Sequence, residues 1–156
     1  MEKLYYILKV ILISAEAALL LSATLIFLFA KPYIGLATQS LSINEELEKF
    51  IILAPIGLSG WLLNELRQMV FEDEKSAKLL VTWPSYWKLK AHISVSLLYC
   101  GLFTLLAIIP WLTQKGTKSD LGFTLFTTGL CGLLIVASSV YTARFTIKEK
   151  LASANL

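Results

Sequence analysis

Four long apolar segments, separated by charged or aromatic residues, dominate the chain. The first covers residues 10–30 between Lys9 and Lys31, and its length matches the roughly 20 residues that an α-helix needs to cross a bilayer. A cleaved signal peptide would instead have an apolar core of about 7–15 residues followed by small residues. Because this segment is longer and has large apolar side chains at positions 27–29, we predict a helix that spans the membrane.

The second segment is purely apolar only over residues 50–63, which is too short for a crossing. Ser42 and Glu45 have the spacing of a capping box, in which a hydroxyl and a carboxylate satisfy free N–H groups at a helix start. We therefore predict a helix over residues 46–68. Pro55 lies inside this range and removes a backbone hydrogen bond, so we expect a kink there.

The third and fourth segments cover residues 91–112 and 121–143, and a short polar turn at 113–120 joins them. Helices joined in this way must pack as an antiparallel hairpin. Trp87 and Trp111 are typical of aromatic belts at the two membrane interfaces, and a helix between them covers about 36 Å. That length fits a bilayer together with its interfaces.

The composition agrees with this pattern, since 56% of the residues are hydrophobic, 16% are charged, and the mean hydropathy is +0.70. Soluble domains have about 45–50% apolar and 25% charged residues. Four crossings leave no room for a second globular domain. We predict an all-α fold in which residues 1–156 form a single domain of four transmembrane helices, arranged as two antiparallel hairpins in the inner (plasma) membrane.

Basic residues predict the orientation. Of the 14 Lys and Arg residues, ten lie at the two termini and between the second and third segments, whereas four lie in the other two loops. Because cytoplasmic loops are enriched in Lys and Arg, both termini and the connection over residues 71–90 should be cytoplasmic. Acidic residues dilute the positive charge of that connection, so we expect no direct binding of nucleic acid.

The connection over residues 71–90 combines charged residues with a cluster of aromatic side chains. One interpretation is an interfacial segment whose lysines reach lipid phosphates. The other is a docking site for a cytosolic protein or a second copy, because Trp and Tyr often carry the binding energy of interfaces. The candidate residues for either role are Trp83, Tyr86, Trp87, Lys88 and Lys90.

Glu16 is the acidic residue within the first predicted span, about 10 Å along the helix from Lys9. A charged side chain at this depth costs several kcal/mol unless it is protonated or paired. We expect polar residues on the other helices at a similar depth, namely His92, Asn64 and Arg144. The functional interpretation is a gating, ion-binding or proton-sensitive site, and the structural one is a hydrogen bond that fixes helix packing.

Small residues recur every three or four positions on several segments and predict faces where helices pack closely, within the chain or between copies. They are Ser14, Ala18 and Ser22 on the first, Gly57 and Gly60 on the second, and Thr124, Thr128 and Gly132 on the fourth.

Catalytic motifs are not found in the sequence, which has one histidine, no paired intramembrane carboxylates and no phosphate-binding glycine loop. Cys100 and Cys131 fall within predicted spans, where a thiol behaves as a small apolar group. We therefore expect no enzyme activity, disulfide, metal or cofactor.

Three classes of function fit these features. The first is a membrane subunit that senses or scaffolds and recruits a cytosolic partner through the central connection. The layout of four spans, cytoplasmic termini and a central connection containing Trp83-Pro84-Ser85-Tyr86-Trp87-Lys88-Leu89-Lys90 resembles the small four-span membrane subunits of phage-defence systems of the Kiwa type. That resemblance implies a membrane oligomer that senses or scaffolds and acts with a cytosolic effector. The alternatives are an immunity protein against a pore-forming or depolarising toxin, and a small oligomeric channel or transporter.

Overall fold

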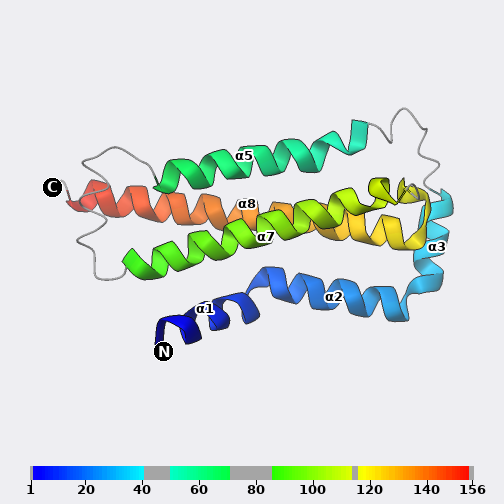
Figure 1. The fold of residues 1–156 in the computed structure, drawn as a ribbon, viewed down its shortest axis with the longest axis horizontal. Coiled ribbons are helices and arrows are strands. Elements are labelled where there is room, and N and C mark those ends of the chain that lie inside the picture. The colour runs from blue at the N-terminus through cyan, green and yellow to red at the C-terminus, as the bar shows by residue number, and fades with distance from the viewer. Residues whose placement is uncertain (1, 41–49, 71–85, 114–115, 155–156) are drawn as a thin grey trace.

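The fold is described by a computed structural model that covers residues 2–40, 50–70, 86–113 and 116–154. Within these ranges the regular structure is helical, without strands, as the long apolar segments predicted. The helices are α1 (Glu2–Leu12), α2 (Ala15–Phe29), α3 (Lys31–Ser40), α5 (Leu53–Val70), α7 (Tyr86–Leu112), the short 3₁₀ helix η1 (Gly116–Lys118) and α8 (Asp120–Ala154). Figure 1 shows most of them running roughly parallel to one long axis.

The centre of the fold is the predicted hairpin of α7 and α8, which lie side by side (Figure 1). Phe103 of α7 is fully buried together with Leu133 and Val136 of α8. Both helices extend beyond the bounds predicted from the sequence. Helix α7 has 27 residues and is about 40 Å long, and α8 has 35 residues and is about 52 Å long. Each is long and apolar enough to cross a membrane.

The first apolar segment differs from the single helix predicted over residues 10–30. Only α2 lies wholly inside this segment, and the first residues of the segment belong to the end of α1; the two helices meet at a bend of 46°. Ser14 is the N-cap of α2, with extended backbone angles, and its hydroxyl accepts a 3.1 Å hydrogen bond from the N–H of Ala17. A capping serine begins a new helix because its side chain satisfies a backbone N–H that has no partner in the helix.

The second apolar segment also differs from its prediction. A turn at Ile52 precedes α5, and Pro55 is the third residue of that helix. Phe50 and Ile51 are also helical, so the helix is interrupted at Ile52, within one turn before Pro55, whose missing N–H removes a backbone hydrogen bond there; the expected disturbance at Pro55 takes the form of this break. The predicted capping box at residues 42–45 lies outside the described residues.

Two helices, α7 and α8, can cross a membrane by length and composition, or three if the bent pair α1–α2 is one span. Helix α5 is not among them in the described part of the chain, so a fourth crossing remains a prediction. Many large apolar side chains are exposed on the bundle, including Leu25, Leu105 and Leu134. Such a surface fits lipid as the surrounding solvent.

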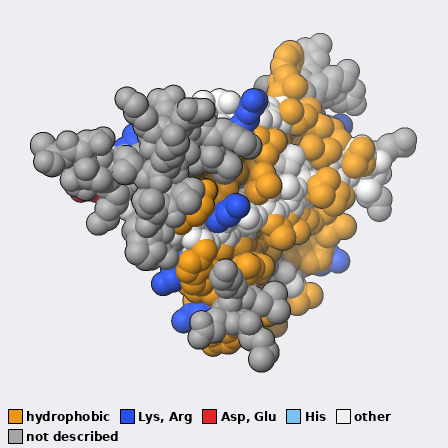
Figure 2. Space-filling model, turned by 60° about the vertical axis from the view of Figure 1, so that its left-hand side comes forward, with side chains coloured by type: hydrophobic (Ala, Val, Ile, Leu, Met, Phe, Trp, Pro, Cys, Tyr) orange, Lys and Arg blue, Asp and Glu red, His pale blue; other side chains and the backbone are white. Residues whose placement is uncertain are grey.

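The two ends of the bundle differ. At one end α3 crosses the tip of the α7–α8 hairpin, where the Thr38 hydroxyl donates a 3.2 Å hydrogen bond to Asp120 at the start of α8. At the other end lie the start of α1, the end of α5, the start of α7 and the end of α8 (Figure 1). Figure 2 brings this second end forward and shows Lys and Arg side chains bordering hydrophobic surface. We call it the basic end.

Candidate functional site

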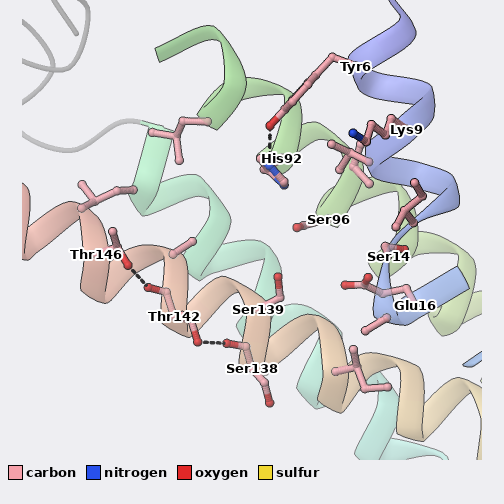
Figure 3. A pocket seen from close by; sticks show the side chains of 18 residues that line it. Tyr6, Lys9, Ser14, Glu16, His92, Ser96, Ser138, Ser139, Thr142 and Thr146 are labelled. Carbon is pink, nitrogen blue, oxygen red and sulfur yellow. Dashed lines mark hydrogen bonds between the residues drawn. The ribbon is translucent and has the colours of Figure 1, made fainter. Parts of the chain in front are cut away.

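A cavity of about 900 Å³ opens near the basic end, between the α1–α2 break, the first half of α7 and the second half of α8. Its wall combines apolar side chains with charged and hydroxyl-bearing ones. Ten of the lining residues are labelled in Figure 3. The break between α1 and α2 brings Lys9 from the last turn of one helix and Glu16 from the first turn of the next to the same cavity. The site is thus assembled from three separate stretches of sequence.

Glu16 is buried, with 7% of its surface exposed, and its carboxylate points into the cavity (Figure 3). No hydrogen bond or ion pair joins it to any other residue that the structure describes. Its place in the first turn of α2 gives it some stabilisation from the helix dipole. A buried carboxylate that faces an open cavity is suited to bind a ligand that brings a positive charge.

Two hydroxyl groups that line the same cavity as Glu16 also have no partner among the described residues. Ser96 of α7 and Ser139 of α8 line the cavity, and neither forms a hydrogen bond within the described ranges. Their neighbours behave differently, since Ser94 and Ser138 donate 2.9 and 3.0 Å hydrogen bonds to carbonyls of their own helices. Ser96 and Ser139 can therefore serve a ligand (Figure 3).

His92 lines the same cavity, as its predicted depth suggested, and pairs with the Tyr6 hydroxyl at 3.1 Å. The Tyr6 ring also meets Trp87 edge-on, at 5.0 Å between centroids, and the Lys88 ammonium lies 5.8 Å from both rings. Two of the predicted interface residues thus help to attach α1 to α7. Tyr86 is half-buried and Lys90 exposed, whereas Trp83 lies outside the described residues.

Tyr99 is a residue that the sequence analysis missed. It is buried in α7, and its hydroxyl donates a 2.7 Å hydrogen bond to the carbonyl of Ile11. That carbonyl lies in the last turn of α1, where the break leaves it without a helical partner, and the Ser14 hydroxyl donates a second bond to it at 3.2 Å. Tyr99 and Ser14 together stabilise the break that shapes the cavity.

Replacing Tyr99 by phenylalanine should destabilise this break. The Ile11 carbonyl would lose its shorter hydrogen bond, at a cost of about 1 kcal/mol. We expect a small fall in melting temperature in detergent and faster hydrogen exchange of amides near residues 11–15. Tyr141→Phe is the matched control, because Tyr141 is exposed on α8. Equal exchange rates in the Tyr99→Phe variant and the unmodified protein would contradict this role of the hydroxyl.

The other predicted polar residues do not join Glu16. Arg144 pairs with Glu65 of α5 and donates a 3.0 Å hydrogen bond to Gln68, while Asn64 is exposed. Arg144 points away from Glu16 because successive side chains of an α-helix project about 100° apart. Ala143 therefore lines the cavity, while the side chain of Arg144 points toward α5.

The small residues have mixed roles. A Cβ atom on Gly132 would lie 2.2 Å from the Phe103 ring, so this glycine permits the close approach of α7 and α8. Gly129 has the same role and was missed, although its spacing of three residues before Gly132 is visible in the sequence. The other predicted positions differ in their surroundings: Ser14 caps α2, Thr124 bonds to the Asp120 carbonyl, Thr128 is half-buried, and Ala18, Ser22, Gly57 and Gly60 are exposed.

Among the described residues, no group of three or more His, Cys, Asp or Glu side chains could hold a metal ion. Cys100 is buried in α7 and Cys131 is exposed on α8, both as free thiols.

The sequence matches no protein-family model, no curated protein and no solved structure. The described residues define the class as an all-helical protein with two or three helices able to cross a membrane.

Proposed function

We propose that the protein is a non-enzymatic integral membrane subunit that crosses the inner membrane four times and recruits a cytosolic partner. The basic end is the cytoplasmic end in this proposal, since Lys and Arg are enriched in cytoplasmic segments. The segment predicted over residues 46–68 supplies the fourth crossing. The layout that resembles Kiwa-type subunits supports a role in anti-phage defence, as a sensor or scaffold.

The observation that carries the proposal is the length of α8. Its 35 residues extend about 52 Å, whereas the hydrocarbon core is about 30 Å thick. The helix begins at the hairpin turn, so its surplus length lies at the basic end. This extension carries the exposed side chains of Lys148 and Glu149, and α7 carries those of Lys88 and Lys90. Together they provide a charged surface for a soluble protein.

Homo-oligomerisation is part of the proposal. Ala18 and Ser22 on α2 and Gly57 and Gly60 on α5 are exposed, and a Cβ atom added at either glycine would meet nothing within 4 Å. Small residues on an exposed helix face allow close contact between transmembrane helices. These faces are available to a second copy.

Recruitment can be tested by charge reversal at the basic end. We expect the tagged protein, purified in mild detergent from its host, to carry a stoichiometric cytosolic partner identified by mass spectrometry. The double variant Lys88→Glu with Lys90→Glu should reduce that partner by about tenfold or more, because like charges across an interface oppose binding. Lys31→Glu is the matched control, since Lys31 is exposed at the opposite end. Recovery of the same partner with the double variant would refute the proposed docking surface.

A further inference from the structure

We propose that the cavity at the α1–α2 break holds a membrane lipid whose headgroup carries both a primary ammonium and a phosphate, as a phosphoethanolamine group does. The inference rests on unpaired groups of both charges in one cavity and on its apolar walls. It requires the membrane placement of the helices but does not depend on recruitment of a cytosolic partner.

The ammonium half of the headgroup fits Glu16. This carboxylate is buried, has no partner in the described part of the chain and points into the cavity (Figure 3). Ser96 and Ser139 face the same space and have lone pairs that no described donor uses. A primary ammonium has three N–H donors, so one carboxylate and two hydroxyls can satisfy it completely. A quaternary ammonium has no N–H groups and could not use the hydroxyls.

The phosphate half fits Lys9. It lines the cavity from the last turn of α1, and it is not within ion-pair distance of Glu16 or of any other described acidic residue. A ligand with only positive charge would be repelled by Lys9, and one with only negative charge would be repelled by Glu16. A zwitterion pairs with both groups. His92 is engaged by Tyr6 and is not required.

The surroundings fit a lipid better than a free headgroup. The same cavity has apolar wall supplied by Val10, Ile13, Leu89, Val95 and Ile135. On α7 the cavity reaches from Leu89 to Ser96, which is about 11 Å of helix. This stretch begins just inside Trp87, and because Trp residues are typical of membrane interfaces, the cavity lies at the depth of the interface. A volume of about 900 Å³ accepts a headgroup together with the first part of its acyl chains.

Lipid binding to the purified full-length protein provides the test. The delipidated protein in detergent is titrated with short-chain phosphatidylethanolamine, phosphatidylcholine and phosphatidylglycerol, and bound lipid is counted by native mass spectrometry. We expect phosphatidylethanolamine to bind about tenfold more tightly than the other two, because charge-assisted hydrogen bonds to its N–H groups are lost with either competitor. Equal binding of all three lipids would overturn the proposal.

Variants assign the contacts. Glu16→Gln should weaken phosphatidylethanolamine binding by about tenfold, and Lys9→Gln should weaken it by several-fold. Ser139→Ala should weaken it by about threefold, whereas Ser138→Ala should leave it unchanged, because the Ser138 hydroxyl already bonds to the Leu134 carbonyl. If Glu16→Gln fails to fold, the two serine variants and Lys9→Gln still decide the matter. Wild-type affinity in Ser139→Ala and Lys9→Gln together would overturn the proposed geometry.

Two further outcomes would point to a different ligand or to a different source of the headgroup. Tighter binding of an amphiphilic amine without phosphate, strengthened in Lys9→Gln, would replace the lipid by an organic cation and overturn the proposal. Free phosphoethanolamine that competes as well as the whole lipid would overturn the lipid as its source. The single variant Lys90→Glu, which leaves the contact of Lys88 with Tyr6 and Trp87 intact, should weaken partner recruitment and retain lipid binding, so failure of partner recruitment and failure of this site give different results.

Discussion

Replacing Gly132 by alanine should lower the melting temperature of the detergent-solubilised protein by roughly 6–12 °C. The new Cβ atom would lie 2.2 Å from the ring of Phe103, which is itself fully buried between α7 and α8. A ring held on all sides cannot move away without disturbing its neighbours. Overpacking of this kind costs about 1–3 kcal/mol, and the depth of this overlap places the cost near the upper end.

Gly101→Ala is the matched control for this prediction. Gly101 lies on the exposed face of α7, and an added Cβ atom would meet nothing within 4 Å. Alanine favours a helix over glycine by about 1 kcal/mol, so this variant should be at least as stable as the unmodified protein. Equal melting temperatures for Gly132→Ala and Gly101→Ala would show that the two helices are not this close.

The second large effect is expected at the ion pair that joins α5 to α8. The side chains of Arg144 and Glu65 are only 27% and 15% exposed, so each would be left as a poorly hydrated charge if its partner were removed. Glu65→Met or Arg144→Met alone should cost about 2 kcal/mol, between the values for exposed and fully buried pairs. The double variant should cost less than the sum of the two, because no unpaired charge remains.

A double-mutant cycle measured by unfolding in detergent checks this prediction. The coupling energy should be at least about 1 kcal/mol. Gln68→Ala serves as the control, because it removes only the exposed hydrogen bond from Arg144 and should change stability by less than either methionine variant. Additive effects of Glu65→Met and Arg144→Met would mean that the pair does not hold α5 in place.

The candidate site was only partly predictable from the sequence. Glu16 was identified because an acidic residue in an apolar segment is costly, and His92 because it lies at a similar distance from the membrane interface. Ser139 and Tyr99 gave no such signal, since a serine or tyrosine within a span is common and its importance depends on where its hydroxyl points. Arg144 was expected near Glu16, but the rotation of α8 directs it toward α5.

The sequence by itself determined that the chain is helical, where the α7–α8 hairpin turns, and which end of the bundle is basic. These features follow from local rules, because a spanning segment must satisfy its own backbone hydrogen bonds and its apolar length sets its extent. Only the tertiary structure decided that the first segment breaks at Ser14 and that Glu16 faces a cavity with Lys9. The reason is that a serine within an apolar span can cap a new helix but does not by itself show that the helix breaks; the hydrogen bond from Tyr99 to the carbonyl of Ile11, 88 positions away in the sequence, supports the break, and no local pattern specifies it.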